Sequence, residues 1–485
     1  MSRTTVIKNA DWVIAWDPEG GAEGTGGHVY LKNADVAFRD HELIHVGKGF
    51  DGDADVTLDG SGRMIVPGFI NVHSHPASEP GNKGLNEELG SPRLGQSSLY
   101  EYMPVFRMLP EGASPAMRFA IHEMLKSGVT TYCDLSMARD GWVEDVASTG
   151  IRGVLCPMYR SAAWTTKDGH SVVYDWDEAA GERAMERAIA TIDEADAHPS
   201  GRMSGMMGPS QIDTCTAELI QASHKEAMDR GITMHIHAAQ SVVEFNEMTR
   251  RHGMTPIEWL DDLGVLTDGT IVAHGIFLND HPWLHWPQAN DFGRLVASGA
   301  GVAHCPNVFW RRGIALNHVG RYMDAGIPLG LGTDTFPHNF IHEMEVAMIA
   351  GRLMAGDFTN ATTEQIFYAA TAGAARLIGR DDIGRLEPGC KADFTVVDCG
   401  HPYMQPLRDP IRSLIYSAGD RAVEDVWVHG QKVVSKGMVE RIDVADAAAK
   451  LNEFQEITIS GVRQRDWAGR DIDTMTPRVF ETRDR

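Results

Sequence analysis

The sequence predicts an α/β fold: a (β/α)8 barrel of the TIM type, together with a small β-sandwich built from both ends of the chain. Three observations lead to this prediction. Between residues 67 and 381, buried-strand runs alternate with amphipathic helices, which is typical of parallel βα units. Before and after this region, short strands follow one another without helices. A barrel takes about 250 residues, so a chain of 485 residues leaves room for a further unit.

Both ends of the chain have strand patterns. Residues 4–16 and 28–50 alternate as short strands, and the pattern returns in GRLEPGCKADFTVVD and AVEDVWVHGQKVVSKGMV, which are typical of hairpins. We therefore expect residues 1–66 and 382–440 to form one composite β-sandwich. Residues 441–485 are expected to form a C-terminal tail, with one helical stretch followed by an irregular, charged end.

Eight strand segments are expected in the barrel, which spans residues 67–381. In chain order they are MIVPGFINVHSH, VTTYCDL, GVLCPMY, MSGMMG, ITMHIHA, GTIVAHG, GAGVAHC and IPLGLGTD. The helices between and after them are predicted over 116–127, 177–195, 217–230, 340–355 and 363–378. Because the C-terminal ends of barrel strands form the catalytic face, residues at those ends are the candidates for chemistry.

Charge and composition restrict the expected partners and location. Acidic residues outnumber basic ones, 67 to 44, and the formal net charge is -23. That field repels phosphate backbones and anionic lipid, so nucleic acid is not an expected partner. The chain has neither an apolar run of about 18 residues nor a basic start followed by an apolar stretch, so we expect no membrane span and no signal peptide. Six scattered cysteines, without close metal-site or redox spacing, predict reduced thiols in a cytoplasmic protein.

Four histidines and one aspartate stand where predicted barrel strands end. They are His73 and His75 on the first strand, His237 on the fifth, His274 on the sixth and Asp334 on the eighth. The first two are two residues apart, so both side chains point to the same side of the strand. One histidine at a strand end is more often structural than a ligand, but five such groups at one end of a barrel are not explained by chance. Imidazole and carboxylate are good ligands for zinc or iron(II), so the set predicts a metal centre.

At these positions the chain resembles the amidohydrolase superfamily, and the resemblance covers nearly the whole sequence. It is most similar to the cytosine-deaminase and triazine-hydrolase branch. The segment HSHPASEPGNKGL is also similar to the phenylurea and molinate hydrolases of that branch. The motifs that carry the resemblance are PGFINVHSH (67–75), HIHAAQS (235–241), VAHG (272–275), GLGTD (330–334) and GRLEPGCKADFTVVD (384–398).

The resemblance implies a role for each strand-end residue. His73, His75, His237 and Asp334 are implied metal ligands, and His274 lies beside the metal, in contact with water or substrate. Binuclear members carry a carboxylated lysine on strand four, whereas MSGMMGPSQID contains no lysine. One divalent ion per chain is therefore expected: zinc, with iron(II), manganese or cobalt as alternatives. In the expected reaction Asp334 takes a proton from metal-activated water, and His274 helps to stabilise the oxyanion.

One position departs from the deaminases of this branch. They carry a proton-shuttling glutamate three residues after the strand-five ligand, whereas this chain has Gln240, which forms hydrogen bonds but exchanges no proton at neutral pH. A carbonyl substrate needs no ring protonation, so we predict hydrolysis of a C–N bond in a small, aromatic amide, urea or (thio)carbamate. The alternative is an aminohydrolase, a deaminase or dechlorinase of an N-heterocycle such as a triazine, purine or pyrimidine. A non-enzymatic scaffold would require missing ligands, and none is missing.

Four further residues are candidate contacts for the small-molecule substrate. His304, in HCPN, ends the seventh strand and is similar to a substrate-contacting segment of the family. Phe309 and Trp310 either line an apolar pocket or pack within a loop. His338, in TDTFPHN, either faces the pocket or caps a loop. The two arginines after Trp310 are expected in a solvated turn, and the protein is expected to form a homo-oligomer.

Overall fold

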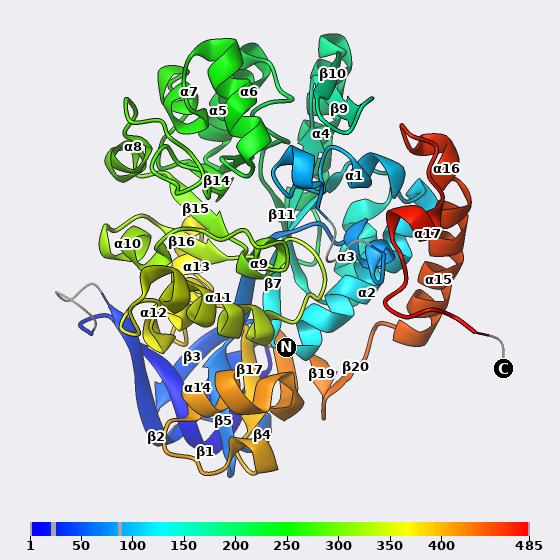
Figure 1. Ribbon diagram of the computed structural model, residues 1–485. Helices are drawn as coiled ribbons and strands as arrows, with labels where there is room; N and C mark the ends of the chain where they lie inside the picture. The colour runs from blue at the N-terminus through cyan, green and yellow to red at the C-terminus, as the bar shows by residue number, and fades with distance from the viewer. Residues whose placement is uncertain (1, 21–25, 86–89, 484–485) are drawn as a thin grey trace.

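The computed structural model of the chain describes residues 2–20, 26–85 and 90–483. The strands of the two chain ends lie together at one side of the molecule. A larger α/β body, made of the strands β6 to β16 and the helices around them, lies above them in Figure 1. Among the described residues, no helix combines the length and the apolar character that a membrane crossing needs.

The two ends of the chain share one nine-stranded sheet, which we call the end sheet. Its strand order is β20-β19-β18-β17-β5-β1-β2-β3, with β4 paired to β1. The antiparallel pairing of β5 with β17 joins the two ends and places Ile65 opposite Val396. The strands are β1 (Thr4–Asp17), β2 (Gly27–Arg39), β3 (Glu42–Gly47), β4 (Val56–Asp59), β5 (Arg63–Pro67), β17 (Phe394–Asp398), β18 (Val423–Val428), β19 (Gln431–Ser435) and β20 (Met438–Val439).

The α/β body contains two parallel sheets. Isolated parallel bridges connect them on both sides, between Ser74 and Asp334 and between Met207 and Met234. The first sheet consists of β6 (Phe69–Ser74), β7 (Val129–Met137), β8 (Arg152–Tyr159), β11 (Met203–Gly205) and β12 (Gly208–Pro209). The second consists of β13 (Met234–Ala238), β14 (Thr270–His274), β15 (Gly301–His304) and β16 (Leu329–Leu331).

The first predicted strand, MIVPGFINVHSH, is wrong as a single element. Its first half is β5 in the end sheet, and its second half is β6 in the α/β body. Gly68 stands between them, with its N–H donated to the Asp393 carbonyl. A Cβ at Gly68 would lie 2.1 Å from Thr130 Oγ1, so only glycine fits where the chain passes from one sheet to the other.

The fourth predicted strand, MSGMMG, is interrupted. The Met206 N–H donates to Leu155 O on one side, whereas the Met207 N–H donates to Thr233 O on the other. Because consecutive residues bond to opposite neighbours, the segment bridges the two sheets instead of continuing as one strand. It therefore appears as β11 and β12, with the bridge between Met207 and Met234 beside them.

Helices surround the strands of the α/β body. Those that match predicted helices are α2 (Ala113–Lys126), α4 (Glu178–Asp196), α5 (Ala217–Arg230) and α11 (Phe340–Ala355), and the helix predicted over 363–378 is divided into α12 (Thr363–Ala369) and α13 (Ala372–Leu377). Thr216 and Thr362 cap α5 and α12 by accepting a hydrogen bond from the third helical N–H.

Elements that were not predicted are α1 (Tyr102–Val105), α3 (Trp142–Thr149), the hairpin β9 (Ala162–Thr166) and β10 (Val172–Trp176), α6 (Val242–His252), α7 (Pro256–Asp262), α8 (Asp291–Ser298), α9 (Pro306–Trp310) and α10 (Val319–Asp324).

The C-terminal tail is more helical than the single stretch predicted. It contains α15 (Val444–Ser460), α16 (Val462–Arg465) and α17 (Ile472–Met475), which lie beside α1 and α2 in Figure 1. Between β17 and β18 the chain forms short helical turns instead of a direct hairpin. They are η5 (Pro402–Met404), α14 (Pro410–Ser413), η6 (Leu414–Ala418) and η7 (Gly419–Ala422).

A buried ion pair connects the end sheet to the α/β body. Arg152, at the start of β8, donates from Nε to Asp393 Oδ2 at 2.8 Å and from Nη2 to Asp393 Oδ1 at 3.1 Å. Both side chains are 1% exposed. The His429 N–H donates to the same carboxylate at 2.6 Å. Asp393 thus neutralises a buried guanidinium and also bonds a backbone group.

Removal of this carboxylate should destabilise the fold. We expect Asp393→Ala to lower the free energy of unfolding by about 3–5 kcal/mol, because the Arg152 charge would stay buried without its partner. Urea unfolding followed by tryptophan fluorescence measures the change. The control is Asp446→Ala, which removes an exposed i,i+4 pair with Lys450 and should cost less than about 1 kcal/mol. Equal losses in the two variants would contradict the importance of burial.

Candidate metal centre

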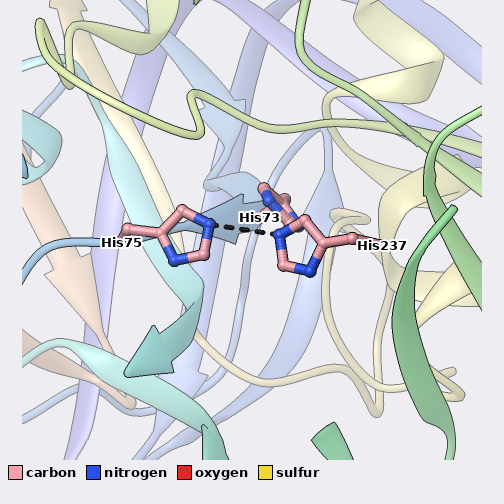
Figure 2. A group of neighbouring side chains, drawn as sticks. All are labelled: His73, His75 and His237. Carbon is pink, nitrogen blue, oxygen red and sulfur yellow. Dashed lines mark hydrogen bonds between the residues drawn. The ribbon is translucent and has the colours of Figure 1, made fainter. Parts of the chain in front are cut away.

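Three histidines and one aspartate converge at the C-terminal ends of the parallel strands. His73 and His75 lie on β6 and just after it, His237 is on β13, and Asp334 follows β16. His75 Nε2 is 3.2 Å from Asp334 Oδ1, and His73 Nε2 is 3.5 Å from the same oxygen. Figure 2 shows His75 and His237 facing each other, with their Nε2 atoms 3.2 Å apart and His73 beside them. The predicted ligands therefore lie close together in space.

The hydrogen bonds of the Nδ1 atoms of His75 and His237 determine whether their Nε2 atoms, which face the centre, present a lone pair. His75 Nδ1 is 2.8 Å from Leu135 O, and His237 Nδ1 is 2.6 Å from Ser210 O. A carbonyl only accepts, so each Nδ1 carries the hydrogen, and in neutral rings each Nε2 presents a lone pair. Two such lone pairs facing each other beside the Asp334 carboxylate repel, unless a metal ion lies between them or one ring carries a proton, as in the hydrogen bond drawn in Figure 2. The donor set therefore fits a divalent cation.

His73 completes this donor set, and His235 orients it. His73 Nε2 is buried and has no hydrogen-bond partner among the described residues, whereas His73 Nδ1 is 3.0 Å from His235 Nε2. Burial lowers the pKa of His235 well below its usual value, so this ring is neutral. With His73 Nε2 bound to a metal, the His73 hydrogen is on Nδ1 and His235 Nε2 accepts it. Partners of this kind orient a metal-binding histidine. Our sequence reasoning missed His235, although it precedes His237 by two residues and so lies on the same face of β13.

His274 and Asp334 both adopt left-handed backbone conformations. Their φ angles are 80° and 59°, which is uncommon for residues other than glycine and concentrates at functional sites. His274 Nε2 is 4.0 Å from Asp334 Oδ2, so His274 lies beside the proposed ligands. Burial lowers the pKa of His274 to about 3, which keeps the imidazole neutral. Burial alone would raise the pKa of Asp334, but the adjacent imidazoles of His73 and His75 outweigh it and hold this pKa well below its usual value.

Gln240 lies in the turn after β13, and a buried carboxylate supports that turn. Ala239 is left-handed, with φ 55°. Glu244, on α6, accepts from the Ala239 N–H at 2.5 Å and from the Gln240 N–H at 3.5 Å. The Gln240 Nε2 atom is buried and has no hydrogen-bond partner among the residues described. Sequence reasoning missed Glu244, because no motif points to it.

The predicted substrate contacts have different surroundings. His304 is buried at the end of β15, and burial lowers its pKa to about 4. Phe309 packs edge-on against the His274 ring, with centroids 4.7 Å apart, and Trp310 is half-buried. Both aromatic residues belong to the short helix α9, so the alternative in which they pack within a loop is wrong in its secondary structure. His338 Nδ1 is 2.9 Å from Thr333 Oγ1, while its buried Nε2 has no described partner.

Groups that were not predicted also surround the centre. The two arginines expected in a solvated turn are half-buried: Arg311 donates to Thr335 Oγ1 at 3.0 Å, and the Arg312 charge acts on Glu79. Burial raises the pKa of Glu79, which lies in the loop after β6. Cys305 also lies at this centre, because its Sγ is within 4.8 Å of ring nitrogens of His73 and His274.

Comparison with known proteins completes the description of this site. A model of the amidohydrolase family matches residues 64–433. A 5-methylthioadenosine/S-adenosylhomocysteine deaminase from Natronomonas pharaonis is 30% identical over 432 residues, which cover 86% of this chain and 94% of the relative. An adenosine deaminase from Xanthomonas campestris with bound zinc has a TM-score of 0.77 at 22% identity, covering 94% of this chain and 98% of that one. A zinc complex of atrazine chlorohydrolase from Arthrobacter aurescens has a TM-score of 0.76 at 21% identity, covering 93% and 100%.

Proposed function

Because the chain belongs to the amidohydrolase family, we propose that it is a metal-dependent aminohydrolase of a small N-heterocycle. The family match confirms the resemblance drawn from the motifs and the prediction of a hydrolase of carbon–nitrogen bonds other than peptide bonds. The relatives are named deaminases, which favours the aminohydrolase alternative over the amide, urea or carbamate reading. The substrate class proposed here therefore differs from our first prediction.

The architecture proposed for this function is a closed barrel. The bridges on both sides of the two parallel sheets support closure, and the barrel would span residues 67–381. Residues 1–66 and 382–440 would form the composite sandwich around the end sheet, with residues 441–485 as the tail. In this arrangement the proposed ligands stand together at the catalytic face of the barrel.

We propose that His73, His75, His237 and Asp334 hold one divalent ion, with zinc as the first candidate. The observation that carries this proposal is the pair of Nε2 atoms of His75 and His237, which lie 3.2 Å apart beside the Asp334 carboxylate. The segment MSGMMGPSQID offers no lysine for a second ion. When bound, such an ion supplies water activated as a nucleophile at neutral pH.

The side chains of this site would move the proton and bind the ring. Asp334 is ionised and would accept a proton from the attacking water, then return it to the leaving nitrogen. His274 is neutral and would bond the substrate atom on which charge develops. Gln240 would donate an amide hydrogen to a ring nitrogen without transferring a proton. Electron-poor rings, such as triazines, accept a nucleophile without full ring protonation and therefore fit this site best.

Gln240 also supports a second candidate, the hydrolysis of an aryl amide, urea or carbamate. An amide donor serves a carbonyl oxygen as well as a ring nitrogen, because both only accept a hydrogen bond. A carbonyl substrate develops its charge on oxygen and requires no ring protonation. The two candidates differ in their product, since an aminated ring releases ammonia and an aryl urea or amide releases an arylamine.

A substrate panel distinguishes the two candidates. Zinc-loaded protein would be incubated with aminotriazines, aminopurines, aminopyrimidines, phenylureas, anilides and carbamates, with ammonia and arylamines both quantified. We expect ammonia from at least one aminated heterocycle, with the triazines fastest. Arylamine release from the carbonyl substrates, without ammonia from any heterocycle, would overturn the aminohydrolase proposal and favour the second candidate.

A further inference from the structure

The C-terminal segment, residues 444–475, lies outside the part of the chain that the family model matches. It nevertheless packs on the loop between β6 and α2, beside α1 and α2 (Figure 1). Val462 and Met475 are buried in one apolar cluster with Val105 and Phe106 of that loop. Burial of these side chains holds the two segments together.

Polar contacts add to this apolar cluster. Arg465 Nε donates to Val105 O at 2.6 Å. Glu101 Oε1 accepts from Trp467 Nε1 at 3.0 Å and from Arg470 Nη2 at 2.7 Å. Glu101 is only 6% exposed, so this charge-assisted pair is shielded from solvent. The tail thus holds the loop after β6 in place by both apolar packing and charged contacts.

Gln455, on α15, contacts the segment that follows the proposed ligand His75. Its Nε2 group donates to Gly81 O and to Lys83 O, each at 2.8 Å. These two carbonyls belong to the 3₁₀ turn η2 (Glu79–Asn82) and to the residue that follows it. Because one amide group bonds two carbonyls of the same turn, it fixes the position and the orientation of η2.

The turn η2 carries Glu79, whose side chain is 7% exposed. The Glu79 N–H donates to His75 O at 3.1 Å, and the charges of His75, Asp334 and Arg312 act on its carboxyl group. Glu79 is therefore next to the proposed metal ligands, and a shift of η2 would move its carboxyl group relative to them.

We propose that Gln455 is a positioning residue that holds Glu79 where its carboxyl group contacts the substrate. Glu79 is then a specificity-determining residue, because its oxygens accept hydrogen bonds from amino or N–H groups beside the reacting carbon. The substrate class is accordingly an N-heterocycle that bears N–H donors, in preference to a fully N-alkylated one. This inference rests on the proposed function.

The test compares Gln455→Glu with Asn452→Asp in full-length, zinc-loaded protein. Both variants change an amide to a carboxylate on α15, but Asn452 is exposed. Gln455→Glu would place acceptors opposite two carbonyls, so we expect faster hydrogen exchange over residues 79–83 and unchanged zinc content. For the aminated heterocycle that the wild type hydrolyses best, KM should rise about tenfold with kcat within about threefold, and Asn452→Asp should match the wild type.

Two further variants keep the test decisive. Gln455→Met removes the donors without adding charge and should give the same pattern if Gln455→Glu folds poorly. Glu79→Gln should discriminate less between N–H and N-alkyl substrates, and its effect on KM should not add to that of Gln455→Glu. Unchanged exchange at 79–83 in both Gln455 variants, or additive effects on KM, would overturn the inference. Exchange is measured without substrate, so the absence of any deamination would refute only the proposed function.

Discussion

Asp334→Asn should lower kcat by a factor on the order of 10²–10⁴ and leave the fold intact. The carboxylate lies 3.2 Å from His75 Nε2 and 3.5 Å from His73 Nε2, so it is both a proposed ligand and the group beside the attacking water. Asparagine has the same shape but accepts no proton. Steady-state kinetics at saturating zinc, together with the melting temperature and the zinc content, would measure the effect.

A second buried aspartate provides the control for this substitution. Asp134, on β7, is fully buried like a core residue, but its oxygens accept from Tyr132, Ser136 and Trp142. Asp134→Asn should lower the melting temperature because it breaks this network, whereas kcat of the folded protein should stay near the wild-type value. Comparable kcat values for Asp334→Asn and the wild type would contradict the proton-transfer role of Asp334.

His237→Ala should lose metal and activity together. This substitution removes one of the four proposed ligands. We expect zinc affinity to fall by more than about 100-fold, because the loss of a residue that only supports a ligand already costs up to about 100-fold. His235→Ala removes such a support, the acceptor of the His73 Nδ1–H, and should weaken zinc binding by about 10–100-fold. Competition with a fluorescent zinc chelator measures both affinities. An equal or larger loss in His235→Ala would contradict the ligand assignment.

Much of the candidate centre can be predicted from local sequence. Strand periodicity places His73, His75, His237 and Asp334 at strand ends, and parallel strands bring their C-terminal ends to one face. The same pattern identifies His235, because residues two apart share a face of a strand. The β9–β10 hairpin also has alternating residues, but it interrupts the regular βα order, so a prediction based on that order passes over it.

The surroundings of the centre could not be predicted in this way. Gln455 lies 374 residues after Gly81 and 372 residues after Lys83 in the sequence, yet it donates hydrogen bonds to both. No local sequence pattern predicts such a contact. The division at Gly68 likewise depends on the close approach of Thr130, a tertiary contact that strand propensity does not contain.

The central claim, one catalytic metal ion held by this site, is tested most directly by a zinc titration. Chelator-stripped protein would be titrated with zinc, with the bound metal and the hydrolysis of the best panel substrate measured in the same samples. Our account predicts negligible activity without metal and a linear rise that ends at one ion per chain. An endpoint at two ions, or full activity in the metal-free protein, would contradict it.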